Sequence, residues 1–134
     1  MKYLFALGAF MLFSCSAKHE ENSEWKEMED FHTIMADVYH PLKDDNNLAP
    51  IKQHSDELAA SAMKWAEADL PARVDNDETK RLLNDLKDGC QQLAKSIKDG
   101  VADEEISAKL TALHDTFHSI MEKWHQSGKE EDDL

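Results

Sequence analysis

Apolar residues recur every three or four positions along most of this chain, and this helical period is the feature that most restricts its fold. The chain has only three prolines and four glycines, and no stretch alternates apolar and polar residues for long enough to indicate a β-sheet. The apolar stripes predict four helices: over about residues 23–40, from Pro50 to about Leu70, from the DNDE segment at 75–78 to Gly100, and over about 103–127.

Residues that commonly end helices separate these segments. Pro41 predicts a helix boundary at His40, because the residue before a proline avoids the helical conformation. Gly128 is expected to end the fourth helix. Short links force consecutive helices to run antiparallel. We therefore predict one domain, an all-α, up-down-up-down antiparallel four-helix bundle over residues 23–127, followed by an acidic tail, residues 128–134.

The first 14 residues, MKYLFALGAFMLFS, are of a different kind. One lysine precedes an apolar run that is too short to span a bilayer as a mature helix, which is typical of a secretory signal peptide. The LFS sequence before Cys15 resembles the lipobox of bacterial lipoproteins. The resemblance implies that Cys15 is lipidated and that residues 15–22 form a tether. The alternative is an ordinary signal peptide cut nearby, which leaves Cys15 as a free thiol.

Location and charge restrict the partners. Because Ser16 rather than Asp follows Cys15, the resemblance implies an outer-membrane lipoprotein of a Gram-negative cell envelope, facing the periplasm or the cell surface. The full chain carries a net charge of −13, and removal of residues 1–14 takes away one lysine and no acid, which leaves −14. This charge repels polyanions, so nucleic acid is excluded as a partner, and membrane contact is expected only through the lipid anchor. With Cys15 lipidated, Cys90 is predicted to be a buried apolar residue without a disulfide.

Three histidines are predicted to meet inside the bundle. His114 and His118 lie four residues apart, on nearly the same face of one helix. A helix rises roughly 1.5 Å per residue, so the depth of a residue can be estimated from its distance to the helix end. Measured from the end of the bundle that holds the link between the first two helices, His32 and His114 both lie at a depth of roughly 15 to 17 Å, on neighbouring helices. Imidazole is a preferred ligand of Zn, Cu and Ni. His32, His114 and His118 are therefore candidate metal ligands, which Asp115 and Glu29 can orient or complete.

Structural roles are the alternative for several of these side chains. His32 and His114 can instead be core-edge residues whose ring nitrogens bond to neighbouring carboxylates. Trp25, Trp65 and Trp124 all fall near the opposite end of the bundle from the first link. We expect these tryptophans to seal that end of the core rather than to bind a ligand.

Four further side chains are possible ligands. His40 and His54 are close enough in depth to form a possible secondary metal site near the first link. Met28 and Met35, together with Met121, flank the level of the main cluster and would suit Cu(I) as soft ligands. Methionines at such positions are more often simple packing residues, because Met fills irregular cores.

Two segments, FHTIM in the first helix and LHDTFHSIM in the fourth, resemble small bacterial periplasmic four-helix-bundle proteins, including the cytochrome b562 type. The resemblance implies haem b with Met28 or Met35 and His118 as axial ligands. No CxxCH motif is present, so covalent c-type haem is excluded. The YHPL segment and the terminal LHxxFH pattern resemble small bacterial lipoproteins without a known activity. The histidines that this second resemblance implicates are His32, His40, His114 and His118.

The sequence patterns of common catalytic centres are missing. There is no Gly-rich phosphate loop and no catalytic triad, and the paired motifs of di-iron bundles do not occur together. We therefore expect no enzyme activity. The sequence predicts a lipid-anchored periplasmic or cell-envelope protein that binds Zn, Cu or Ni for buffering or sensing. The alternatives are a b-type haem protein and a structural envelope module that binds a partner protein.

Overall fold

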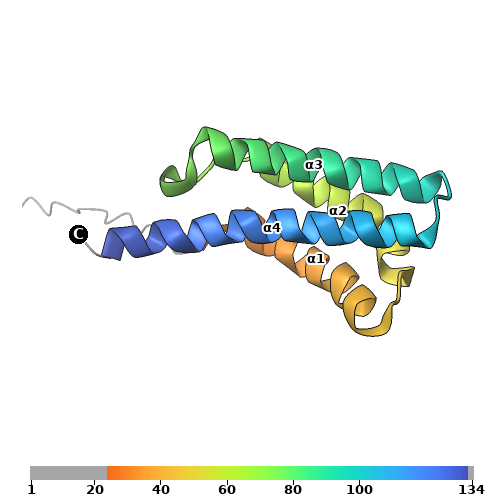
Figure 1. Cartoon of the computed structure of the whole chain (residues 1–134). Coiled ribbons are helices and arrows are strands. Elements are labelled where there is room, and N and C mark those ends of the chain that lie inside the picture. Colours follow the sequence, from red (N-terminus) through yellow and green to blue (C-terminus); the bar gives the residue numbers. More distant parts are fainter. Residues whose placement is uncertain (1–23, 133–134) are drawn as a thin grey trace, which may run out of the picture.

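In the computed structural model, residues 24–132 are described, and their four α-helices run alternately up and down (Figure 1). The elements are α1, Lys26–Asp45; α2, Ala49–Glu67; the 3-10 turn η1, Ala72–Val74; α3, Asp77–Lys98; and α4, Asp103–Asp132. Consecutive helices pack against each other, and α1 also contacts α4. The predicted all-α, antiparallel four-helix bundle is confirmed. The predicted signal peptide, Cys15 and the tether lie outside the described residues.

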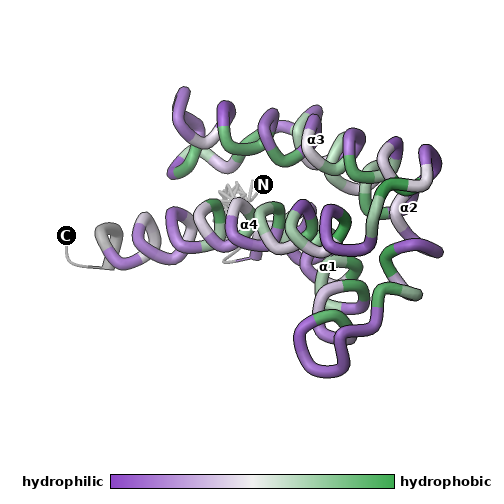
Figure 2. Tube along the Cα trace, turned by 45° about the vertical axis from the view of Figure 1, so that its right-hand side comes forward, coloured by the Kyte–Doolittle hydropathy of each residue, from purple (hydrophilic) through white to green (hydrophobic). Residues whose placement is uncertain are grey.

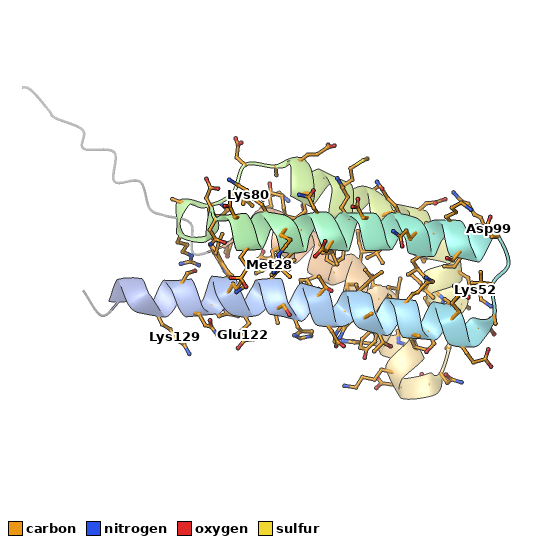
Figure 3. The ribbon with its side chains drawn as sticks, turned by 45° about the horizontal axis from the view of Figure 1, so that its top comes forward. Met28, Lys52, Lys80, Asp99, Glu122 and Lys129 are labelled. Carbon is orange, nitrogen blue, oxygen red and sulfur yellow. The ribbon has the colours of Figure 1, made fainter. Side chains whose placement is uncertain are left out.

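Each helix buries one apolar stripe, and burial of apolar surface is the dominant favourable term in folding. In Figure 2 the polar residues of α3 lie mainly on its outer side and its apolar residues face α4. Met28 points into the space between the helices, whereas Glu122 and Lys129 point away from it (Figure 3). The largest fully buried side chains are Trp25, Trp65, Phe31, Phe117, Met35, Ile51, Leu58, Leu86, Leu93, Ile106, Leu110 and Ile120.

Three tryptophans close one end of the core, as the sequence predicts. The ring centroid of Trp25 lies 5.1 Å from that of Trp65 and 5.5 Å from that of Trp124. All three rings are buried, and the guanidinium carbon of Arg73 lies 3.3 Å from the centroid of the Trp124 ring. A guanidinium over an indole face is attracted by the ring quadrupole. Arg73 from η1 therefore covers the end that the tryptophans form.

Three predicted helix boundaries are confirmed in detail. The side chain of Asn76 accepts the N–H of Thr79 at 2.9 Å and so caps the start of α3. Gly100 follows α3 with φ of 75°, a conformation that glycine adopts without the steric penalty of a Cβ. Pro50 lies in the first turn of α2, where its missing N–H has no helical partner to lose.

The predicted boundary at His40 is wrong, because α1 continues through Pro41 to Asp45. The helix ends at Asn46, which is left-handed at φ 52°, and the N–H of Asn46 bonds to the carbonyl of Leu42 at 2.9 Å. The N–H of the next residue bonds to the carbonyl of Pro41 at 3.0 Å. These bonds cap the last turn, so α1 ends there rather than at the proline, whose missing N–H costs the helix one hydrogen bond.

The predicted end of the fourth helix at Gly128 is also wrong. α4 passes through this residue and reaches Asp132, so that residues 128–132 belong to the helix rather than to a tail. A Cβ at position 128 would lie only 3.1 Å from Nη1 of Arg73. The glycine therefore leaves room for Arg73 to reach Trp124, and its role is in packing rather than in capping.

Exposed ion pairs connect neighbouring helices. Nζ of Lys98 lies 2.9 Å from Oδ1 of Asp56, and Nζ of Lys123 lies 2.8 Å from Oε1 of Glu78. Exposed pairs of this kind contribute at most about 1 kcal/mol each, so the apolar core carries the stability.

None of the described helices combines the length and the apolar character that crossing a membrane would require.

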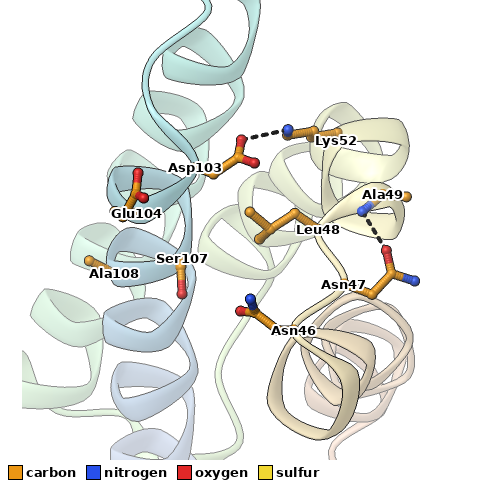
Figure 4. A pocket seen from close by; sticks show the side chains of 9 residues that line it. All are labelled: Asn46, Asn47, Leu48, Ala49, Lys52, Asp103, Glu104, Ser107 and Ala108. Atoms are coloured by element: carbon orange, nitrogen blue, oxygen red, sulfur yellow. Dashed lines mark hydrogen bonds and ion pairs between the residues drawn. The ribbon is translucent and has the colours of Figure 1, made fainter.

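The C-terminal end of α1 diverges from α4 (Figures 1–3). A groove of about 590 Å³ lies between the link from α1 to α2 and the start of α4 (Figure 4). Oδ1 of Asn47 accepts the N–H of Ala49 at 3.0 Å, and Lys52 binds Asp103 at 2.7 Å. The second of these contacts ties the start of α2 to the start of α4 across the groove.

The core predicts a large effect at Phe117. Its ring is fully buried, and its centroid lies 5.6 Å from that of Phe31. We expect Phe117→Ala to lower the free energy of unfolding by about 3–5 kcal/mol, because it leaves a cavity. Met63, which is 40% exposed, provides the control, and Met63→Ala should cost less than about 0.5 kcal/mol. Urea unfolding followed by circular dichroism measures both, and equal losses would contradict the burial of Phe117.

Candidate metal centre

His114 and His118 form a close pair on α4. They are four positions apart in the sequence, so their side chains leave the same face one turn apart. Their Nε2 atoms lie 3.0 Å apart, and their ring centroids are 4.3 Å apart. The two nitrogens point at each other and share one hydrogen bond. The sequence-based prediction that these two residues meet is therefore confirmed.

The ring of His114 is held in place by Tyr39 of α1. The two rings are stacked, with centroids 3.7 Å apart and planes inclined by 16°. The His114 side chain is only 21% exposed, and its Nδ1 atom is buried without a hydrogen-bond partner among the described residues. The nearest acid oxygen, Oδ1 of Asp115, lies 3.9 Å from Nδ1, which is too far for a hydrogen bond. Stacking on Tyr39 and the hydrogen bond from Nε2 to His118 therefore hold this imidazole, and Nδ1 makes no hydrogen bond.

The surroundings of His114 favour its neutral form. Burial lowers the pKa of His114 below its ordinary value, because an imidazolium is poorly solvated there. The neighbouring His118 lowers this pKa further, and His40 and Lys43 act in the same direction, while Asp115 opposes them. A neutral imidazole is the form that binds metal ions. The site therefore keeps His114 in its ligand form at neutral pH.

His32 does not join the pair as a third neighbour. It is exposed on α1 and stacks on Phe117, with ring centroids 5.1 Å apart. Since Tyr39 is the α1 residue beside His114, His32 lies two turns from that level along α1. Within residues 24–132, no three His, Cys, Asp or Glu side chains lie close enough together to hold one metal ion. The pair therefore offers two protein ligands.

His40 and His54, the possible secondary site, have different neighbours. His40 is exposed on α1, and its charge acts on His114. Nδ1 of His54 lies 3.0 Å from Oε2 of Glu57, one turn further along α2. The structure thus associates His40 with the pair on α4, and His54 with a carboxylate of its own helix.

The sulfur-containing candidates are buried. Met28 and Met35 are 7% and 1% exposed and belong to the hydrophobic core, so ligation of haem by either sulfur would require the core to open. Cys90 is also buried, as the sequence predicts, and burial raises the pKa of its thiol to about 12. A thiol with so high a pKa is almost entirely protonated at neutral pH and is a poor nucleophile and metal ligand.

The aromatic partners of the histidines are the site residues that sequence reasoning missed. Tyr39 and Phe117 both belong to predicted apolar stripes, and their contacts with His114 and His32 depend on how α1 and α4 are aligned. A sequence pattern shows that a residue faces a neighbouring helix, but it does not show which residue it meets there.

Comparison with known protein families, with curated proteins and with solved structures finds no match for the chain.

The lowered pKa of His114 predicts a pH dependence of stability. The unfolded chain binds a proton at this residue more readily than the folded chain does, so stability falls as pH decreases through about 6.5 toward the lower folded pKa. Melting temperatures between about pH 5 and 8 should show this slope. We expect His114→Gln to flatten it and the exposed-site control His125→Gln to retain it. Identical slopes in the wild type and His114→Gln would contradict the assignment.

Proposed function

We propose that this chain is a cell-envelope protein that binds a divalent transition-metal ion through the Nε2 atoms of His114 and His118. The observation that supports the proposal is their 3.0 Å separation. With metal–nitrogen bonds of about 2.0–2.1 Å, this separation corresponds to a nitrogen–metal–nitrogen angle of about 95°. The angle is close to the roughly 90° of the square-planar and tetragonal sites that Cu²⁺ and Ni²⁺ prefer. Tetrahedral Zn²⁺ would require a separation of about 3.3 Å, which a small rotation of the exposed His118 ring provides.

The surroundings of the pair favour a bound cation. When both Nε2 atoms bind an ion, each ring carries its proton on Nδ1, and Asp115 is the carboxylate nearest to Nδ1 of His114. Tyr39 holds the same ring by stacking, so less freedom is lost when the ion binds. The net charge of −13 also attracts cations to the surface.

The number of ligands suits exchange rather than permanent storage. Structural zinc sites use four protein ligands, whereas this pair supplies two and leaves the other positions open. An ion held in this way can be passed on, which fits buffering or sensing. Anchoring through a lipid on Cys15, which lies outside the described residues, would keep this activity at the envelope membrane.

Metal binding by the soluble chain, residues 16–134 without a His tag, tests the proposal. At a free ion concentration one hundred times Kd, binding to the folded state adds about 2.7 kcal/mol, which raises the melting temperature by roughly 10 °C. We expect Cu²⁺ to bind most tightly, since Ni²⁺ and Zn²⁺ follow it in the general order of affinity.

The controls separate the pair from the other histidines. His118→Ala should abolish most of the metal-induced rise in melting temperature, whereas His125→Ala, an exposed histidine two turns further along the same helix, should retain it. Melting curves that none of the three ions changes, or an equal response from both variants, would sink the proposal.

A further inference from the structure

The proposed metal centre is incomplete within one molecule. His114 and His118 provide two nitrogens, and the part of the chain that the structure describes has no third His, Cys, Asp or Glu placed to join them. Square-planar Cu²⁺ and Ni²⁺ and tetrahedral Zn²⁺ each take four ligands. The two remaining positions must therefore be filled by water or by donors from another molecule.

Resting on the proposed function, we propose that a second copy of this chain supplies the missing ligands, so that one ion joins two molecules through four imidazoles. Two copies related by a two-fold axis present the same patch to each other. An axis through the ion sets His114 and His118 of one molecule opposite the same two residues of its partner. An angle of about 95° within each pair lets both pairs lie in one plane around Cu²⁺.

The position of the pair on the molecule allows this arrangement. His118 is exposed on α4, and the C-terminal end of α1 diverges from α4 (Figure 1). Charges of both signs lie near the pair, because both Lys43 and Asp115 act electrostatically on His114. When two molecules approach through these sites, each site therefore faces both positive and negative groups of the other, although each chain is strongly acidic as a whole.

The same acidity makes the association depend on the ion. Two chains with a net charge of −13 each repel one another, and the repulsion weakens as salt screens it. The ion supplies both positive charge and the shared bonds. The expected behaviour is a monomer without metal and a dimer with metal, which turns a metal-binding bundle into a metal-dependent switch of assembly.

Titration with Cu²⁺ tests the shared ion, with residues 16–134 as the sample because the core residues lie within that segment. Sedimentation velocity should show the mass doubling, with the largest dimer fraction at half an ion per chain. Excess Cu²⁺ should return the protein to monomers, because each pair then takes its own ion. Electron paramagnetic resonance at half an ion per chain should show four nitrogens bound to the copper, and EDTA should reverse the association.

Matched variants complete the experiment. His118→Ala should stay monomeric at every copper concentration, whereas His125→Ala should dimerise as the wild type does. The protein could instead stay monomeric and bind one ion per chain, with an electron paramagnetic resonance spectrum that shows two nitrogens bound to the copper. This result would overturn the shared site and leave the proposed function intact. Absence of any copper binding would overturn both. A dimer that forms without metal, or in His118→Ala, would show that the ion is not the link.

Discussion

The burial of Phe117 is the constraint on which the candidate site depends. Its ring packs against Phe31 of α1 and Trp65 of α2, with centroid separations of 5.6 Å and 6.2 Å. This contact fixes the rotation of α4 about its own axis. Because His114 and His118 lie on either side of Phe117 in the sequence, the same rotation brings both histidines to the boundary between core and solvent.

That boundary position gives the two imidazoles different properties. His114 lies partly under Tyr39, where burial lowers its pKa and stacking holds its ring. His118 is exposed, so its ring has more freedom to turn than the ring of His114. A fixed, neutral ligand beside an adjustable one is a favourable combination for binding an ion, since only one side chain must adapt its geometry. The exposed ring of His118 keeps the pair open to solvent on one side.

The two ends of the bundle have contrasting chemistry. Trp25, Trp65 and Trp124 close one end, and Arg73 covers them. The other end carries the polar groove between the first link and the start of α4 (Figure 4). The histidine pair lies between the two, on a helix anchored by the aromatic end.

The sequence by itself determined the four helices, the cap at Asn76 and the closeness of His114 to His118, because periodicity, capping and an i, i+4 spacing act within one helix. It misjudged Pro41 and Gly128, where bonds of the last turn and the approach of a distant arginine decide the outcome. Only the tertiary structure decided which residues of α1 meet α4. The sequence-based estimate of which residues lie at the same depth was counted from the helix ends, and it changes when a helix is longer than expected or is tilted. For this reason Tyr39, rather than His32, lies beside His114.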